Sequence, residues 1–283
     1  MKNVIKTYLL IGLLSGLLIF IGGAIAGEGG VAIALVFSLV FNVIALWFSD
    51  RIVLSMYKAE QIQRSHPSGL YEVVERLARK ANIPMPKVYI IPDNAPNAFA
   101  TGRSPQKAAV AATSGLLLSL SPDEIEAVIA HEITHIKNRD TLVQTLVAVI
   151  ASAIIHITAI AKWGMIFGFG RGEGGDDKGG LFTTILLIIF APIAALLVQA
   201  AISRSREYMA DKGSKDIIGS GMPLANALRK IENVSARGLV MESASQETAH
   251  MFIMNPLSGK SLFVMFSTHP KTEDRIKALL YND

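Results

Sequence analysis

Two histidines and a glutamate stand in a short pattern that could bind a metal ion and use it. His131, Glu132 and His135 form the pattern H-E-x-x-H. On a helix, a spacing of four residues places both imidazoles on one face, where they can bind the same Zn²⁺. The glutamate beside the first histidine is then placed to act as a general base on the attacking water. A pattern with three fixed positions can also arise by chance, so its context decides its weight.

The context favours a metal site. The chain has no cysteine, which excludes thiol catalysis, disulfides and cysteine-bound zinc and leaves histidines and carboxylates as ligands for a transition metal. A strong helix start precedes the pattern, with Ser121 as N-cap, Pro122 at the first helical position and Glu124 at the third. The sequence therefore predicts a well-capped helix that carries the pattern and could run unbroken into the apolar segment beyond it.

A catalytic zinc with two histidine ligands needs a third protein ligand. The candidates by residue type are Glu207, Asp211, Glu232, Glu242, His250 and His269. If the apolar segments 141–162 and 181–203 form an antiparallel hairpin, the chain just before one and just after the other emerges on the same face of the membrane. At about 1.5 Å per helical residue, His135 would stand roughly 9 Å and Glu207 roughly 6 Å above that face. This favours Glu207, for which the alternative interpretation is a solvated helix charge.

The remaining polar candidates are assigned lesser roles. Asp211 lies one turn after Glu207 and could orient a zinc-bound imidazole, or it could be an exposed helix carboxylate. His156 lies inside an apolar segment, about 32 Å from His135 along a continuous helix, and is expected to hydrogen-bond between helices. His66 and His250 have no partner pattern and are predicted to lie at the surface.

Composition indicates a membrane protein with a polar domain. Of the 283 residues, 51% are hydrophobic and 18% charged, and the mean hydropathy is +0.42. This is too apolar for an ordinary soluble domain and too charged for membrane spans alone. The net charge is +4, and the basic residues are scattered, so we expect no nucleic-acid partner.

Four uncharged segments are long enough to cross roughly 30 Å of hydrocarbon, each having 21 residues or more between charges. A removable signal peptide is the alternative for the first, which is longer than the usual apolar part of such a peptide. The predicted organisation is transmembrane helices at 4–26, 31–49, 141–162 and 181–203, a non-cytoplasmic Gly-rich loop at 163–180, and a domain built from 50–140 and 204–283.

The distribution of basic residues predicts the orientation. Nine Lys and Arg near the span ends fall on one side, which should be the cytoplasmic one, while the opposite loop at 163–180 is nearly balanced in charge; the nine are Lys2, Lys6, Arg51, Lys58, Arg64, Lys137, Arg139, Arg204 and Arg206. The two polar regions must form one domain, since each alone is short for a core. Helical spacing at 69–81 and short strands at 88–91 and 108–112, which bracket a turn-rich stretch at 92–106, predict a mainly α fold with a small β-sheet.

Several motifs in this order resemble a known family. H-E-x-x-H at His131–His135 is followed by E-x-x-A-D at Glu207–Asp211, as in the integral-membrane zinc metallopeptidases of the HtpX heat-shock protease family, relatives of the CAAX prenyl proteases. Further matches are Pro96–Gly102, Ser203–Arg206, Ser267–Pro270 and Arg275, and the four apolar segments agree as well. The resemblance therefore spans nearly the whole chain.

The resemblance implies a gluzincin-type zinc peptidase domain at the cytoplasmic face of the inner membrane. It implies one Zn²⁺ per chain held by His131, His135 and Glu207, with Glu132 as the catalytic base. It also implies quality control of misfolded or unfolded membrane proteins, in contact with the lipid bilayer, as part of a stress response.

Two further assignments carry alternatives. In related metallopeptidases an edge strand near the active helix binds the substrate backbone by strand addition, which here points to Asn97, Ala98, Phe99 and Ala100; the alternative is a structural hairpin. His269 could donate a hydrogen bond to the tetrahedral intermediate, or it could cap a helix before Pro270.

Two other functions compete with this one. A prenyl-protein protease would need a large intramembrane chamber and usually more spans. A membrane scaffold or chaperone with a structural zinc would not need Glu132.

Overall fold

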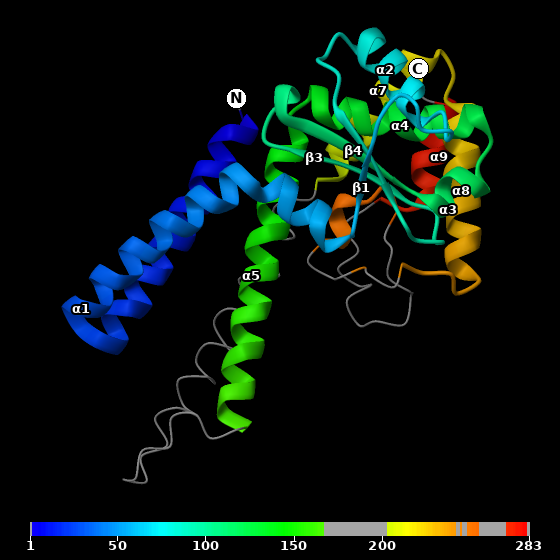
Figure 1. Cartoon of the computed structure of the whole chain (residues 1–283). Helices are drawn as coiled ribbons and strands as arrows, with labels where there is room; N and C mark the ends of the chain where they lie inside the picture. Colours follow the sequence, from blue (N-terminus) through cyan, green and yellow to red (C-terminus); the bar gives the residue numbers. More distant parts are fainter. Residues whose placement is uncertain (1, 167–202, 242–243, 245–247, 255–269, 282–283) are drawn as a thin grey trace.

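A small mixed sheet organises the part of the chain that carries the histidines (Figure 1). The computed structural model describes residues 2–166, 203–241, 244, 248–254 and 270–281. The strands are β1 (Glu60–Ile62), β2 (Lys87–Ile91), β3 (Ala98–Gly102) and β4 (Ala108–Thr113), in the order β1-β2-β4-β3. β2 and β4 are parallel and the other neighbours antiparallel. β3 is therefore an edge strand.

The sheet confirms two predicted strands, adds β1, and contains β3 within the turn-rich stretch, where only the family resemblance pointed to an edge strand. The strands predicted at 88–91 and 108–112 are β2 and β4. β3 lacks the polar alternation of a half-exposed strand, because all five of its residues are buried. It forms through its pairing with β4, which local patterning does not reveal.

One face of the sheet packs against the helices that build the main core. The helix predicted at 69–81 is confirmed as α2, whose residues Leu70, Val74 and Leu77 are buried in this core. The elements on this side are α2 (Leu70–Ala81), α3 (Ser114–Ser119), α4 (Pro122–Lys137), α8 (Met222–Ala236) and α9 (Thr272–Tyr281), with α7 (Arg204–Ile218) packed along α4. α4 lies at the centre of this layer, and all its residues from Ala127 to Ile136 are buried.

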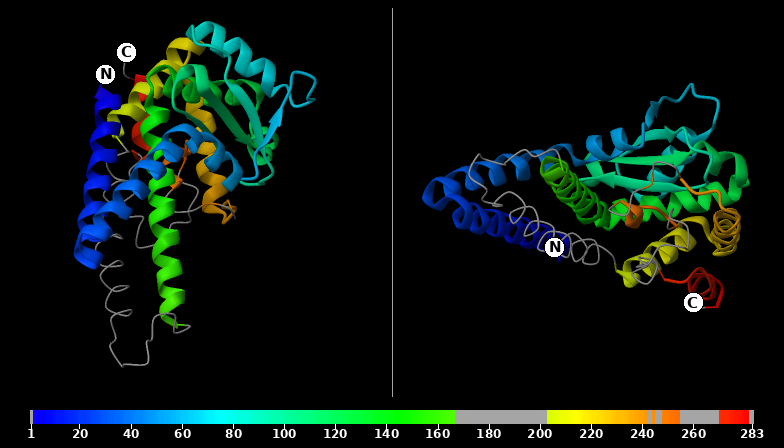
Figure 2. Two further views of the ribbon diagram at one scale, coloured as in Figure 1. Left: turned by 60° about the vertical axis from the view of Figure 1, so that its left-hand side comes forward. Right: turned by 90° about the horizontal axis from the view of Figure 1, so that it is seen from below.

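The other face of the sheet meets the long apolar helices. α1 (Lys2–Met56) and α5 (Asp140–Ile166) share a second core with Phe99 and Phe252. Two 3₁₀ helices, Pro105–Lys107 and Ala249–Met251, complete the described elements. α1 and α5 both extend away from the sheet domain toward the same side (Figures 1 and 2).

α1 folds back on itself to form a hairpin. Gly27 has a φ of +58°, a backbone conformation that glycine adopts without strain, and the two arms run side by side on either side of it. Ser15 and Asn42, from opposite arms, are joined by a hydrogen bond of 2.7 Å. The turn agrees with the one expected between 26 and 31, and the second arm continues to Met56, beyond the expected end at 49.

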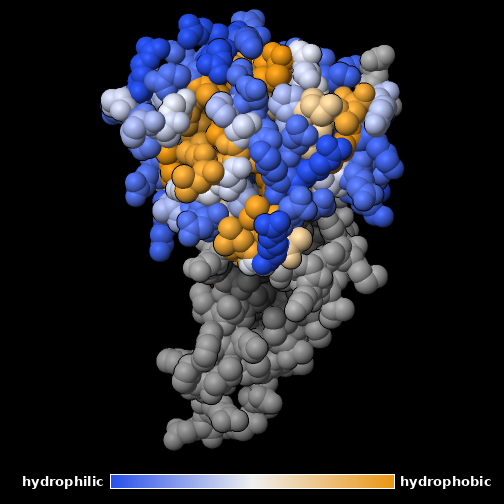
Figure 3. Space-filling view, turned by 90° about the vertical axis from the view of Figure 1, so that its right-hand side faces the viewer, coloured by the Kyte–Doolittle hydropathy of each residue, from blue (hydrophilic) through white to orange (hydrophobic). Residues whose placement is uncertain are grey.

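The second arm of α1 has the character of a membrane span. Gly27–Met56 is the single helical stretch among the described residues that is both long and apolar enough to cross a membrane, and an 18-residue window within it has a mean hydropathy of 2.5. Its exposed side chains include Val36, Phe37 and Trp47. The domain looks different from the side of α8 and α9, where most visible side chains are hydrophilic (Figure 3). The fourth expected span, 181–203, lies outside the described residues except for Ser203. Residues 167–180 of the expected loop at 163–180 lie outside them as well.

The expected continuous helix from Ser121 into the third span is wrong. α4 ends at Lys137, Arg139 has a φ of +59°, and α5 begins at Asp140. A non-glycine residue in the left-handed region cannot continue an α-helix, so the chain changes direction there. The break returns Asp140 toward the histidines, which a continuous helix would have carried away from them.

Candidate metal centre

The N-terminal cap of α4 fixes the helix that carries the site. Ser121 accepts a hydrogen bond from the Glu124 amide, and the Glu124 carboxylate accepts one of 2.8 Å from the Ser121 amide. This reciprocal cap satisfies two amides that a helix start otherwise leaves open. The Glu124 carboxylate also accepts a hydrogen bond of 2.7 Å from Lys230 on α8. The start of α4 is thus tied to its neighbour before the helix enters the core.

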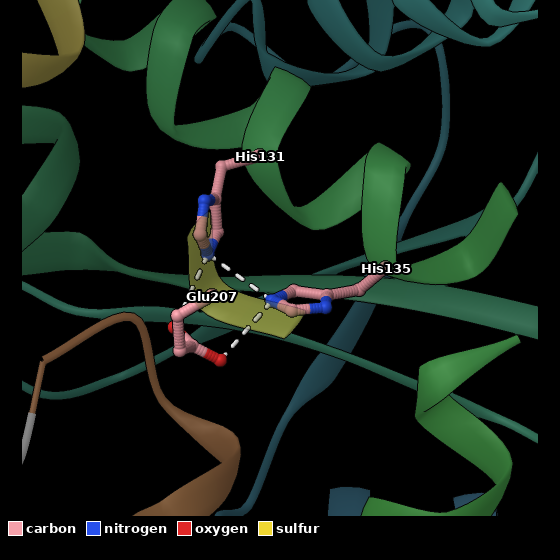
Figure 4. Close-up of side chains that lie close together, drawn as sticks. All are labelled: His131, His135 and Glu207. Carbon is pink, nitrogen blue, oxygen red and sulfur yellow. Dashed lines mark hydrogen bonds and ion pairs between the residues drawn. The ribbon is translucent and has the colours of Figure 1, made fainter. Parts of the chain in front are cut away.

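Three side chains from two helices converge on one point (Figure 4). His131 and His135 lie on one face of α4, and their Nε2 atoms are 3.1 Å apart. Glu207, from α7, places one carboxylate oxygen 3.7 Å from His131 Nε2 and the other 3.6 Å from His135 Nε2. All three side chains are buried. The structure thus brings together the three residues expected to be ligands.

The partners of the two Nδ1 atoms, which are the outer nitrogens of the rings, indicate the protonation state of the two Nε2 atoms in the cluster. His131 Nδ1 lies 3.0 Å from Asp211 Oδ1, and His135 Nδ1 lies 3.1 Å from Asp140 Oδ2. A carboxylate at Nδ1 favours the tautomer with the proton there, which leaves a lone pair on Nε2. Two such lone pairs facing each other at 3.1 Å repel unless a metal ion or a proton lies between them.

The spacing of the two imidazole nitrogens and the Glu207 carboxylate oxygens fits a zinc ion. Two atoms bound to zinc at about 2.05 Å in tetrahedral geometry lie about 3.3 Å apart. The three separations of 3.1, 3.6 and 3.7 Å bracket this value. One carboxylate and two imidazoles also form a known catalytic donor set, with one position left open. The residues present therefore fit the metal that the family resemblance implies.

Glu132 lies next to the cluster without joining it. Its side chain is buried, and the Ala100 amide of β3 donates a hydrogen bond to its carboxylate. Burial raises the pKa of Glu132 to about 8, the nearby Glu207 adding to this while His135 opposes it. Its Oε1 atom has no hydrogen-bond partner among the described residues. A buried carboxylate oxygen held in this way is available to a water molecule or a substrate.

The two histidines differ in their electrostatic surroundings. For His131, burial lowers the pKa, and the hydrogen bond to Asp211 opposes this without reversing it. For His135, burial also lowers the pKa, but the hydrogen bond that it donates to Asp140 and the charges of Glu207 and Glu132 outweigh this and raise the pKa to about 9. The asymmetry arises because His135 faces three carboxylates.

A buried ion pair behind His131 involves the C-terminal helix. Arg275, on α9, is fully buried and donates to both oxygens of Asp211 at 2.9 and 2.6 Å. Its Nη1 lies 3.9 Å from Glu207 Oε2. Burial alone would raise the pKa of Asp211, but the charge and hydrogen bonds of Arg275, together with His131, hold it below its usual range. Asp211 is thus fixed between Arg275 and His131.

Sequence reasoning missed part of this arrangement. The sequence analysis gives no role to Asp140, and the signal that could have found it is a carboxylate five residues after the second histidine. Arg275 was noted as a family match without a role. Both contacts depend on chain reversals that the sequence does not show.

The structure also places the other candidates. Glu232 is exposed on α8, while Glu242 and His269 lie outside the described residues. His250 is not at the surface as expected: it is buried, with Nε2 3.0 Å from the Gln144 carbonyl, because the 3₁₀ helix that carries it packs against α5. His66 is exposed, as expected. The side chain of His156 lies outside the described part of the structure.

Asn97 and the strand that follows it form the edge next to the site. Asn97, Ala98, Phe99 and Ala100 are all buried, and Ala98 and Ala100 face α4 within the main core. The Ala100 amide contacts Glu132. Residues expected to bind substrate therefore lie beside the expected catalytic base.

Comparisons with known proteins agree with the geometry. The model of peptidase family M48 matches residues 65–283. A protease HtpX homolog from Syntrophobacter fumaroxidans is 48% identical over 275 residues, covering 97% of this chain and 97% of the relative. A second protease HtpX homolog, from Pyrococcus furiosus, is 50% identical over 275 residues and covers 97% of this chain and 94% of the relative.

A solved structure shares the fold. The crystal structure of S. mikatae Ste24p matches with a TM-score of 0.54 and 20% identity, over 99% of this chain and 65% of that one. At this identity the likeness concerns the fold alone. The family match and the long, closely similar relatives carry the assignment: the chain belongs to peptidase family M48 and is a zinc metalloprotease of the HtpX type.

Proposed function

We propose that this protein is a membrane-embedded endopeptidase with one zinc ion per chain, which cleaves misfolded or damaged membrane proteins at the cytoplasmic face. The observation that carries the proposal is the convergence of His131 Nε2, His135 Nε2 and the Glu207 carboxylate, whose ligand atoms all lie within 4.8 Å of one another. Glu132 stands beside this cluster, held by the Ala100 amide.

The residues divide the work of peptide hydrolysis. When bound by His131, His135 and Glu207, zinc would polarise the scissile carbonyl and make the attacking water more acidic. Glu132 takes the proton of that water and passes it to the leaving amine. Asp211 and Asp140 keep the outer nitrogens of the histidines protonated and the rings in place. No covalent bond to the enzyme is formed.

The position of the site supports membrane-associated substrates. His135 is followed after five residues by Asp140, where the apolar helix α5 begins. The exposed apolar side chains of Gly27–Met56 are consistent with burial in lipid. With four spans and the basic residues in the cytoplasm, the site would open next to the inner surface of the bilayer. Cytosolic loops and unfolded segments of membrane proteins would be within its reach.

The test is hydrolysis of an unfolded protein by the purified, zinc-loaded chain. Wild type should cleave casein, and Glu132→Gln should lose about 10²–10⁴-fold in turnover while keeping its zinc, because the base is removed and no ligand is. Glu126→Gln is the matched control, since this glutamate lies on the same helix and pairs with Arg76 away from the site. Full activity of Glu132→Gln would refute the mechanism and favour a scaffold with a structural zinc. Cleavage of a prenylated peptide but not of casein would favour a prenyl-protein protease.

A further inference from the structure

A segment of the chain itself lies on the outer edge of β3. The Ile253 amide donates a hydrogen bond of 3.1 Å to the Ala98 carbonyl, and Asn97 Nδ2 donates one of 3.0 Å to the Met254 carbonyl. Phe252 is the antiparallel bridge partner of Phe99. Residues 252–254 thus meet β3 as an added strand does, at the edge where substrate was expected.

The other side of the same segment faces the metal centre. The Ile253 carbonyl accepts a hydrogen bond of 2.9 Å from Arg275 Nη1, an atom that lies 3.9 Å from Glu207 Oε2. In Figure 4 the ribbon of this part of the chain, orange in Figure 1, passes near Glu207. Ile253 therefore presents its amide to the edge strand and its carbonyl to the charged groups beside the metal ligands. An extended substrate residue would do the same.

Several backbone groups on the outer edge of β3 already have hydrogen-bond partners within the protein. The Ala98 amide is satisfied by Asn97 Oδ1 at 3.1 Å, and the Gly102 carbonyl accepts from Thr141 Oγ1 at 2.8 Å. The Ala100 amide donates to Glu132. A substrate cannot pair with Ala98 while Ile253 holds its carbonyl, since both would require the same position.

We propose that residues 252–254 act as an internal peptide that fills the substrate-backbone site and must be displaced before a substrate chain can bind. This inference rests on the proposed function. An incoming backbone remakes the hydrogen bonds that the segment gives up, so the exchange costs little in hydrogen bonding. The lost packing of Phe252 between Tyr57 and Phe99 opposes it. The enzyme is therefore closed at rest and opens for chains that bind well enough to compete.

The contacts that precede the segment allow such a movement without unfolding the site. Before the segment, Thr248 is hydrogen-bonded to the Tyr57 hydroxyl and His250 to the Gln144 carbonyl of α5. The metal ligands belong to α4 and α7, which pack directly on each other. Residues 252–254 can leave β3 while both of these anchors stay in place.

A reversible crosslink tests the proposal, because the native chain has no cysteine. Residues opposite each other in antiparallel strands lie about 4.5–5.5 Å apart at Cα, within the range that a disulfide spans. Phe99→Cys combined with Phe252→Cys should therefore form a disulfide that locks the segment on β3. We expect the oxidised form to hydrolyse casein at least about tenfold more slowly than the same preparation after reduction. Each single-cysteine variant, treated alike, should not respond.

The outcomes separate this inference from the proposed function. A confirmed disulfide without effect on hydrolysis would overturn the inference, and so would failure of the disulfide to form in the folded protein. If zinc-loaded wild type does not cleave casein at all, the proposed function fails instead.

Hydrogen exchange provides a second measurement that needs no cysteine variant. In zinc-loaded Glu132→Gln, which should bind substrate without cleaving it, adding casein should increase exchange at the Ile253 amide as the segment leaves β3. Amides of α2 serve as the internal control and should not change. Unchanged or greater protection of Ile253 would show that the segment is a permanent part of the fold, whatever the activity of the crosslinked variant.

Discussion

Each histidine of the site has Nε2 in the ligand cluster and Nδ1 beside a supporting carboxylate. Mutation of a ligand and mutation of a supporting carboxylate should therefore have different effects. Glu207→Gln replaces a charged ligand with a neutral amide, so zinc binding should collapse and activity with it. Asp211→Asn leaves the ligands in place but weakens the support of His131, which typically costs about 10–100-fold in affinity or activity. Asp216→Asn changes an exposed position on the same helix and should alter neither zinc content nor activity. Zinc content of the purified variants and hydrolysis of casein measure both effects.

A contrast with His269 decides whether Glu207 is the third ligand. If His269 donates to the transition state, His269→Ala should lower turnover by roughly 10²–10³ and leave zinc content near normal. If instead Glu207→Gln retains stoichiometric zinc and His269→Ala loses it, the site is a three-histidine one. The convergence of Glu207 on the two imidazoles would then not reflect the ligand set.

At the scale of elements, the packing of α7 against α4 sets the distance from Glu207 to the histidines. The helices touch where Gly213 meets Thr134: a Cβ at Gly213 would lie 2.4 Å from Thr134 Cγ2 and 2.6 Å from Oγ1. Gly213→Ala should therefore push the helices apart at a cost of about 1–3 kcal/mol, more than the gain of about 1 kcal/mol in helix propensity. We expect weaker zinc binding and a lower melting temperature, although no ligand is touched.

Removing the obstacle should restore the packing. Thr134→Ala deletes both of the closest atoms, so the double variant should bind zinc more tightly than Gly213→Ala alone. Wild-type zinc affinity in Gly213→Ala by itself would show that the approach of the two helices does not control the site.

The cap of α4 makes a pH-dependent contribution to stability. Burial raises the pKa of Glu124, but the ion pair with Lys230 and the hydrogen bonds with Ser121 outweigh it and lower the pKa below its usual value of 4.5. A carboxylate with a lowered folded pKa stabilises the fold above its unfolded pKa, and the contribution is lost as the pH falls through the folded value. Glu124→Gln should therefore reduce the melting temperature at pH 7, and its difference from wild type should shrink below about pH 4.5.

The neighbouring carboxylate provides the comparison for this effect. Asp123→Asn alters an exposed residue of the same helical turn and should change the melting temperature less. A Glu124→Gln difference that stays constant between pH 7 and pH 3.5 would contradict the linkage, since the charged form of Glu124 would then make no special contribution.

At the scale of the whole molecule, the predicted topology places the metal site on the cytoplasmic side of the membrane. Single cysteines can be introduced into a chain that has none and labelled with a membrane-impermeant reagent. Positions in 175–179 should react from the non-cytoplasmic side of sealed membranes, whereas Lys271→Cys should react only after permeabilisation. Casein hydrolysis by each variant serves as the control for folding. The reverse pattern would place the site outside the cell and rule out cytoplasmic substrates.

The sequence by itself determined the chemistry and the local elements. H-E-x-x-H specifies two imidazoles on one helical face, because helical periodicity is a local property. The Ser121 cap, the helix at 69–81 and the strands at 88–91 and 108–112 follow from patterns of a few neighbouring residues. Glu207 was predicted from an expected antiparallel hairpin of the segments 141–162 and 181–203, whereas in the structure it reaches the histidines because α7 packs along α4.

Only the tertiary structure decided which distant groups meet. The break at Arg139 brings Asp140 back to His135, Arg275 reaches Asp211 from a helix at the far end of the chain, and Ile253 occupies the edge of β3. These contacts depend on chain reversals and on packing between elements far apart in sequence. Their energies come from burial and from hydrogen bonds that form only when several elements are in place at once, so no short window of sequence encodes them.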